Sequence, residues 1–351
     1  MFSLTRQDTF VIKGIAICAM LLHHLYGLCP EGVEPYTGVL HWVGLLGKVC
    51  VALFLFCSGY GLASNYRPVS ILDDIKFIGR RLTKFYLNYW IIFFIFVPIT
   101  IYVFHRPLSE AYGNSDLPLH FMMDIFGFQG FNSYNDTWWY NLLIILLYFL
   151  FPLIHRLVRI KPWMAICWGM LLMRLSTRMP INPVEIFTFQ FPFVLGVVWK
   201  FYEGEANHMV LDSKHIAPTI CISLLFFIVT VIVRMYPLIP HWSALRIDGF
   251  VACAVVLCVI TILRRCEHLM IGFAFLGKHS MNIYMIHTFF NAYWHPEWLH
   301  TSAWMREGVN FIILMTICLL ISMVIEYFKE EIGIYRLIKL INEKLYDPKP
   351  I

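Results

Sequence analysis

Apolar runs of about 17–25 residues, long enough to cross a bilayer as α-helices, recur along nearly the whole chain. This pattern predicts an all-α, polytopic integral membrane protein that forms one transmembrane domain over residues 1–351 and has about ten transmembrane helices. The fifth and sixth spans are the weakest, because Arg174 follows a short apolar run and Pro192 interrupts the next. The predicted spans are 9–28, 43–63, 85–104, 137–158, 163–178, 184–201, 216–236, 244–263, 270–293 and 308–328.

The distribution of Lys and Arg predicts the orientation of these spans, because both residues are enriched on the cytoplasmic side of membrane proteins. With the N-terminus inside, nineteen of the 27 Lys and Arg residues fall in inner connections, adjoining helix ends or termini. Six fall on the outer side, and Lys48 and Lys278 lie within spans. The asymmetry predicts a multi-pass protein of the plasma or inner membrane with both termini in the cytoplasm.

Composition supports the membrane class. Hydrophobic residues make up 59% of the chain and charged residues 14%, with a mean hydropathy of +0.68, whereas soluble domains carry about 25% charged residues. The net charge of +5 reflects the inner-side excess of cations, so we infer no nucleic-acid partner. Eight of the ten cysteines fall in spans and no C-x-x-C pair occurs, so neither a disulfide framework nor a metal site is predicted.

Two connections carry patterns of their own. The long outer connection 104–136 mixes Gly, Asn and aromatic residues, which predicts an ordered cap or a re-entrant turn over a cavity. On the inner side, residues 71–84 place three isoleucines on one helical face. That spacing predicts an amphipathic helix lying on the cytoplasmic surface.

The first span contains two ionisable residues, Lys13 and His24. They are eleven residues apart, so on an α-helix they share one face and are separated by about 16 Å of rise. Ionisable groups inside an apolar span are costly and mark a functional interior or a water-filled path. Alternatively, Lys13 extends to the interface and His24 is an ordinary buried histidine.

A second group, Arg80, Arg81 and Lys84, places three cations on about one turn at the cytoplasmic start of the third span. Such a cluster suits the phosphates of an anionic ligand, since Arg forms forked hydrogen bonds. The competing interpretation is the ordinary positive-inside anchor.

Two more groups lie in later spans. Ser280, Tyr284 and His287 follow an i, i+4, i+7 pattern, which places a polar stripe on one face of the ninth span. These side chains line a site or form hydrogen bonds between helices. Trp138 and Trp139, at the outer start of the fourth span, form an interfacial aromatic belt or the rim of a site.

Five segments, in chain order, resemble motifs of the membrane acyltransferase family 3. The motifs are a cation, ten residues and a histidine; an apolar-aromatic run ending in Ser-Gly-aromatic; a basic pair; a Trp-aromatic-Leu run ending in proline; and a Ser…Tyr…His helix. The corresponding segments are Lys13–His24, Val51–Tyr60, Arg81–Lys84, Trp138–Pro152 and Leu276–His287. The family often places an acid three residues before its cation; this chain has Phe10 there, so Asp8 is the candidate substitute.

The resemblance implies transfer of an acyl group, most often acetyl from acetyl-CoA, to a hydroxyl of a cell-surface or lipid-linked saccharide. It implies that His24 acts as general base or carries the acyl group, and that Lys13 places the donor or stabilises negative charge. Acyl-CoA, a saccharide or glycolipid acceptor and the bilayer are the implied partners, with no permanently bound cofactor. The implied donor-phosphate residues are Arg80, Arg81 and Lys84, and the implied substrate-cavity residues are Ser58, Asp136, Trp138, Trp139, Ser280, Tyr284 and His287.

Two other classes remain open. A transporter or flippase for a glycan or related polar substrate would line its path with Lys13, His24 and His287. A haem-binding electron carrier would use histidines as axial ligands. A haem protein would be coloured, and a transferase would hydrolyse acetyl-CoA slowly without its acceptor, whereas a pure transporter would do neither.

Overall fold

The computed structural model describes residues 3–28, 38–68, 70–175, 184–206, 216–236, 244–294 and 308–346. All of the regular structure in these residues is helical, which confirms the predicted all-α class. The chain divides into two compact units: Met1–Gly27, Tyr36–Asn65 and Phe151–Ser280 form unit 1, and Leu28–Pro35, Tyr66–Leu150 and Met281–Ile351 form unit 2.

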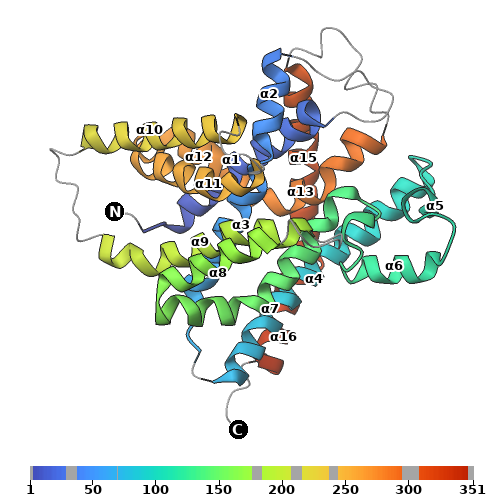
Figure 1. Ribbon diagram of the computed structural model, residues 1–351. Helices are drawn as coiled ribbons and strands as arrows, with labels where there is room; N and C mark the ends of the chain where they lie inside the picture. The colour runs from blue at the N-terminus through green and yellow to red at the C-terminus, as the bar shows by residue number, and fades with distance from the viewer. Residues whose placement is uncertain are drawn as a thin grey trace. The chain divides into compact units, whose positions relative to one another are not determined.

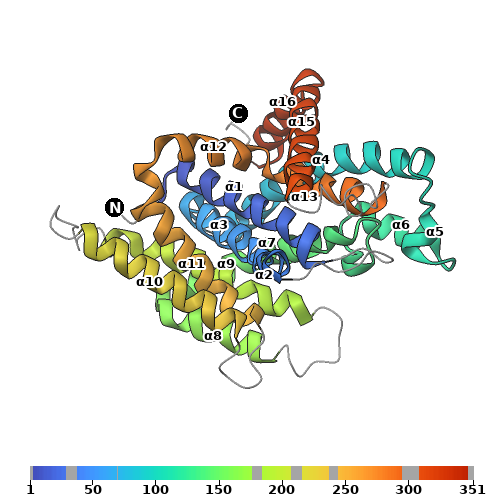
Figure 2. The same ribbon diagram turned by 90° about the horizontal axis from the view of Figure 1, so that it is seen from above.

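Unit 1 is a bundle built around the first helix (Figures 1 and 2). Helix α1 packs against α12 and α3, α3 packs against α9, and α10 packs against α11. The helices of this unit are α1 (Arg6–Leu22), η1 (His23–Gly27), α2 (Gly38–Gly47), α3 (Cys50–Asn65), α8 (Pro162–Leu175), α9 (Val184–Ala206), α10 (Ile216–Met235), α11 (Ala244–Thr261), η6 (Leu263–Arg265) and α12 (Glu267–Lys278).

Helices α1 and α12 touch backbone to backbone through a reciprocal pair of glycines. A Cβ added to Gly14 would lie 2.0 Å from the carbonyl oxygen of Phe273, and one added to Gly277 would lie 1.8 Å from that of Phe10. Small residues at membrane-helix interfaces permit this approach, in which dispersion contacts rather than a hydrophobic effect hold the helices together. The contact fixes the helix that carries Lys13.

Unit 2 is built on the 32-residue helix α4. A capping box starts this helix: the Ser70 hydroxyl accepts from the Asp73 N–H, and the Asp73 carboxylate accepts from the Ser70 N–H at 2.8 Å. The helices of this unit are α4 (Ile71–Tyr102), α5 (Leu108–Tyr112), α6 (Leu117–Ile125), η2 (Gly130–Asn132), η3 (Asp136–Trp138), the first part of α7 (Trp139–Ile160), α13 (Ser280–Thr288) after its first residue, η7 (Phe289–Tyr293), α15 (Val309–Glu331), α16 (Ile334–Ile341) and η8 (Asn342–Tyr346).

The amphipathic segment 71–84 is not a separate surface helix, because it continues without interruption as the first turns of α4. On this stretch Ile71 and Ile75 are exposed, whereas Asp74 and Phe77 are buried. No Gly-Pro or polar sequence that would end a helix separates this stretch from the apolar run that follows, so the helix continues.

Within the residues that the structure describes, seven helices are long and apolar enough to cross a membrane, and they match predicted spans one to four, seven, eight and ten. They are Arg6–Gly27, Gly38–Asn65, Ile71–Tyr102, Asp136–Ile160, Ala217–Met235, Arg246–Arg265 and Val309–Glu331. The fifth predicted span is the 14-residue α8, and the sixth falls in α9. The total of ten and the cytoplasmic location of the termini stay predictions.

The ninth predicted span is not one helix. Helix α12 ends at Lys278, His279 forms its C-cap, and α13 begins at Ser280. The first and second spans are also irregular, since α1 passes into the π-turn η1 at His23 and α2 is separated from α3 at Lys48. Discontinuous membrane helices are typical of binding sites, because their unpaired backbone groups face polar partners.

Candidate active site

Lys13 and His24 lie in parts of the first membrane span that have different backbone geometry. Lys13 is half-buried in regular α-helix, whereas His24 belongs to the π-turn His23–Gly27. A π-turn uses i→i+5 bonds and shifts the direction of the side chains that follow, and such turns are frequent at functional sites. The predicted common face of the two residues assumed α-helical spacing throughout, and therefore stays a prediction.

The two adjacent histidines of the π-turn have different surroundings. His23 is buried, and its Nδ1 lies 2.9 Å from the Gly44 carbonyl oxygen of α2. Because a carbonyl only accepts, this contact places a proton on Nδ1 of His23. His24 is half-buried, and its ring meets the His23 ring edge-on at a centroid distance of 5.4 Å. His23 thus anchors the turn, while His24 is the more accessible imidazole.

Close backbone packing holds this turn in place. A Cβ on Gly44 would lie 2.3 Å from the Gly27 nitrogen, and one on Gly47 would lie 2.3 Å from the Ala19 carbonyl oxygen. Only glycine at these positions allows α2 to approach the π-turn, so the position of the histidine pair is set by backbone contact. Ser58, the half-buried serine of the Ser-Gly-Tyr motif, lies on α3, which packs against α1.

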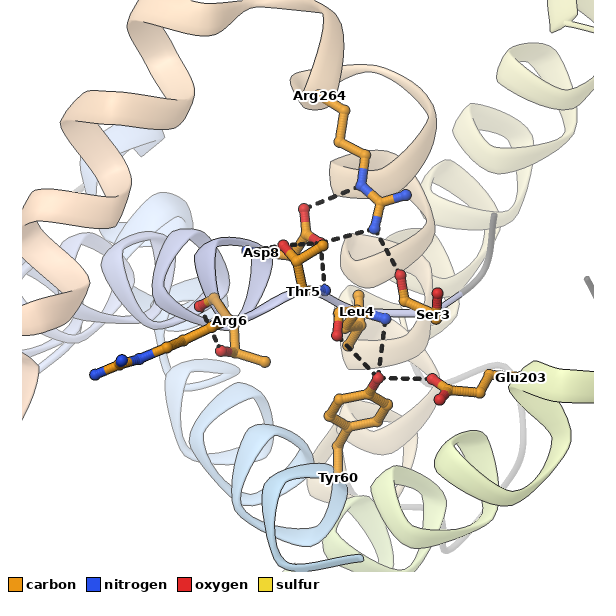
Figure 3. A network of polar contacts seen from close by, with 9 residues as sticks. Ser3, Leu4, Thr5, Arg6, Asp8, Tyr60, Glu203 and Arg264 are labelled. Atoms are coloured by element: carbon orange, nitrogen blue, oxygen red, sulfur yellow. Dashed lines mark hydrogen bonds and ion pairs between the residues drawn. The ribbon is translucent and has the colours of Figure 1, made fainter. Parts of the chain in front are cut away.

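The N-terminal end of α1 is held by a polar network (Figure 3). The Asp8 carboxylate is buried and accepts two bonds from the Arg264 guanidinium, at 3.0 Å to Oδ1 and 2.7 Å to Oδ2. It also accepts from Thr5, which caps the helix. In the structure the Asp8 carboxylate therefore pairs with Arg264, and its role as the substitute for the family's acid stays a prediction.

The aromatic residue of the Ser-Gly-Tyr motif joins the same region. The Tyr60 hydroxyl accepts from the Leu4 N–H at 2.9 Å and donates to Glu203 Oε2 at 2.6 Å. The Lys200 ammonium pairs with Glu203 and lies 5.5 Å from the centre of the Tyr60 ring. Sequence reasoning missed this group, because its members are remote along the chain and Glu203 lies beyond the predicted sixth span.

A second buried ion pair in unit 1 was also missed. The Arg234 Nε of α10 lies 2.5 Å from Asp248 Oδ1 of α11, and both side chains are buried. The charges of Lys48 and Arg234 lie within electrostatic range of the His23 ring. An available signal was Asp248 itself, an acid inside the apolar span 244–263, which needs a cation nearby.

In unit 2, the predicted donor cluster lies on α4. Arg80 and Arg81 are half-buried and Lys84 is exposed. The Arg81 guanidinium lies 5.0 Å from the centre of the Phe77 ring one turn earlier, which holds its aliphatic stem against the helix. The Arg81 side chain is therefore held partly in place by its own helix.

The residues Trp138 and Tyr284, which belong to two groups predicted separately, come together in unit 2. The Tyr284 hydroxyl donates to the Thr137 carbonyl oxygen at 2.7 Å, and the Trp138 indole N–H donates to the Met285 carbonyl oxygen at 3.1 Å. His287 is fully buried, with Nδ1 2.8 Å from the Tyr284 carbonyl oxygen. Helix α13 is thereby joined to the start of α7.

The remaining predicted cavity residues differ in exposure. Trp138 is fully buried against Tyr89 and Phe289, so its ring belongs to the core of unit 2. Trp139 is half-buried and stacks on Phe131 at 5.1 Å, while Asp136 is exposed. Ser280 is buried at the first residue of α13.

The connection 104–136 forms α5, α6 and η2 and folds back along α4, while its outer location stays a prediction. Tyr89, Trp90 and Tyr86 of α4 donate hydrogen bonds to three successive carbonyl oxygens at the end of α6, those of residues 124, 125 and 126, at 2.7, 2.9 and 3.1 Å. The last carbonyls of a helix have no partners within the helix, so these side chains cap α6. The connection 104–136 is therefore attached to the middle of α4.

A buried carboxylate, that of Asp124, accepts hydrogen bonds from several parts of the same connection. Asp124 Oδ2 accepts from the Tyr112 hydroxyl and from the Tyr134 N–H, both at 2.6 Å. Burial raises the pKa of the Asp124 carboxyl, and these hydrogen bonds offset only part of that increase. Next to it, Arg106 donates to the Tyr134 carbonyl oxygen at 2.5 Å and lies 3.8 Å from the centre of the Tyr293 ring.

No three His, Cys, Asp or Glu side chains converge as metal ligands among the residues that the structure describes. The long apolar helices are those of a polytopic helical membrane protein. The chain belongs to the membrane acyltransferase family 3, whose acyltransferase domain matches residues 11–327, and it is therefore a membrane acyltransferase. A search of curated proteins and a search of solved structures each found no match.

Proposed function

We propose that the protein transfers an acetyl group from acetyl-CoA to a hydroxyl of a cell-surface or lipid-linked saccharide in the plasma or inner membrane. The observation that carries this proposal is the family assignment together with a histidine held in a π-turn of the first helix. The π-turn supplies an imidazole in a rigid, half-buried place, which suits acid–base or nucleophilic chemistry near neutral pH.

The donor is bound through its phosphates by Arg80, Arg81 and Lys84. The positive-inside rule predicts that this cluster lies at the cytoplasmic surface, where CoA is available. The cation–π contact of Arg81 with Phe77 supports the assignment, because a pre-ordered guanidinium loses less conformational freedom when it binds phosphate.

The acceptor hydroxyl gives its proton to His24 as its oxygen attacks the thioester carbonyl. The new C–O ester bond forms, the C–S bond breaks, and the CoA thiolate takes up a proton to leave as thiol. In the two-step alternative, the imidazole of His24 attacks the thioester first and then passes the acyl group to the hydroxyl. In either route Lys13 stabilises the negative charge that develops on the carbonyl oxygen.

The acceptor is expected at the outer side. Exposed Asp136 and half-buried Trp139 are suited to hydrogen bonding and stacking with a sugar ring. Ser58, Ser280, Tyr284 and His287 remain proposed cavity residues, whereas the burial of Trp138 supports a packing role for that residue.

Mass spectrometry of surface glycans from wild-type and deletion strains tests the proposal. A loss of one acetyl mass from a defined sugar in the deletion strain, restored by the gene, is the expected result. In parallel, the purified protein should hydrolyse acetyl-CoA slowly without acceptor. Unchanged glycans together with no turnover of acetyl-CoA would overturn the proposal and favour a transporter.

A further inference from the structure

The C-terminal helices of unit 2 return to the basic cluster of α4. Gly333, at φ +75°, forms the left-handed turn that redirects the chain from α15 into α16. Helices α16 and η8 both contact α4. This return brings the last described residues, which sequence analysis assigned no role, to the helix that carries Arg80, Arg81 and Lys84.

A buried polar network fixes this return. The Lys329 ammonium is buried and donates to Asn282 Oδ1 at 2.7 Å and Glu326 Oε1 at 3.1 Å. Asn282 Nδ2 donates to the same Glu326 oxygen at 2.7 Å, and the Tyr335 hydroxyl of α16 donates to the other carboxylate oxygen. Since each charge has a partner, the network holds α16 on α15.

At the end of this segment, the Tyr346 ring rests on α4 at Gly79. A Cβ on Gly79 would lie 2.4 Å from Cε1 of Tyr346, so the ring occupies the space that any other residue would fill. The Tyr346 hydroxyl lies 3.3 Å from the Thr83 hydroxyl. Gly79 and Thr83 are four residues apart, so they form one stripe along the helix surface.

The next stripe of α4 is Arg80 and Lys84, turned about 100° from Gly79 and Thr83. The tyrosine ring therefore lies beside the cations and remains half-buried rather than enclosed. An aromatic ring next to a basic cluster is the arrangement that binds nucleotides, because bases stack on aromatic faces while Arg and Lys hold phosphates.

We propose that Tyr346, seated on Gly79, forms the part of the donor site that receives the adenine nucleotide of acyl-CoA. This inference rests on the proposed function, because it extends the phosphate cluster of Arg80, Arg81 and Lys84. Contact with the tyrosine ring makes a nucleotide-bearing donor bind more tightly than a short thioester. A short thioester ends before it reaches the ring.

The test compares KM for acetyl-CoA with KM for S-acetyl-N-acetylcysteamine, a thioester donor without the nucleotide. Tyr346→Ala should raise KM for acetyl-CoA by about five- to tenfold and leave KM for the short donor unchanged, as loss of one stacked base predicts. Gly79→Ala should do the same by displacing the ring. Tyr346→Phe, which keeps the ring, and Leu345→Ala, an exposed neighbour, should behave as wild type.

Thermal stability measured on the same preparations separates folding from binding. Equal increases of KM for both donors in Tyr346→Ala would show that the ring only supports α4 and would overturn the inference, as would no change for either donor. The double variant Arg81→Gln/Lys84→Gln distinguishes the two proposals. If it weakens acetyl-CoA binding while Tyr346→Ala does not, the nucleotide assignment alone fails; if it leaves binding unchanged, the proposed donor site fails.

Discussion

The ion pair between Asp8 and Arg264 is expected to stabilise unit 1 by joining residues 256 positions apart in the chain (Figure 3). Asp8 is buried, so replacing it with Ala leaves the guanidinium without its carboxylate and removes half of the capping box. Breaking a buried pair costs about 3–5 kcal/mol, and a lost cap costs about 1 kcal/mol. Arg264 is partly exposed, so water recovers part of its hydration.

We therefore expect Asp8→Ala to lower the free energy of unfolding by about 3–5 kcal/mol. Asp8→Asn should cost less, because the amide oxygen still accepts from Thr5. The interaction itself is measured by a double-mutant cycle with Asp8→Asn and Arg264→Gln, followed by equilibrium unfolding in mixed micelles. The two charge-assisted bonds predict a coupling free energy of about 1.5–3 kcal/mol.

The exposed pair Lys339–Glu343, whose nearest atoms are 3.9 Å apart, provides the matched control and should show no measurable coupling. A coupling below about 0.5 kcal/mol for Asp8 and Arg264 would refute the reasoning, because it would equate a buried, two-bond pair with an exposed one.

Three further predictions concern the site. His24→Ala should abolish acetyl transfer in a folded, inserted protein, whereas His23→Ala should retain activity but lower thermal stability, because it loses the bond to α2; the reverse pattern would move the chemistry to His23. Arg81→Gln/Lys84→Gln should raise KM for acetyl-CoA tenfold or more, with added salt weakening the wild type more than the variant; normal donor affinity in correctly inserted protein would leave the cluster a topology signal. Trp138→Phe should destabilise the protein by about 1–3 kcal/mol through the lost hydrogen bond to the Met285 carbonyl oxygen and the lost volume, with little change in KM for the acceptor; a large, selective KM effect would return this residue to the substrate site.

Patterns that depend on neighbouring residues were predictable from the sequence. The apolar runs predicted the seven long helices, and the ordered motifs predicted the family. The ordered nature of the connection 104–136 followed from its Gly, Asn and aromatic content. These features are local or depend only on order along the chain, so one sequence contains them.

Contacts between distant segments were not predictable in the same way. The spacing rules treat each span as a regular α-helix, so they missed the π-turn at His23 and the break at His279. An aromatic at a helix start is commonly an interfacial residue, and nothing local distinguishes the buried Trp138 from the half-buried Trp139. The pairing of Asp8 with Arg264 was not predicted, because Arg264 lies far along the chain.

Because three aromatic side chains of α4 cap α6, the site at which an epitope is inserted near α6 determines whether this contact is preserved. Residues 113–116, which precede α6, are exposed and lie in a bend that begins at Gly113 with φ +73°. A short epitope inserted there leaves the bonds from α4 to α6 intact. An epitope inserted after Phe126 would pull the capped carbonyls away from α4. The first site therefore allows antibody access to report which side of the membrane the connection faces in an otherwise unaltered enzyme.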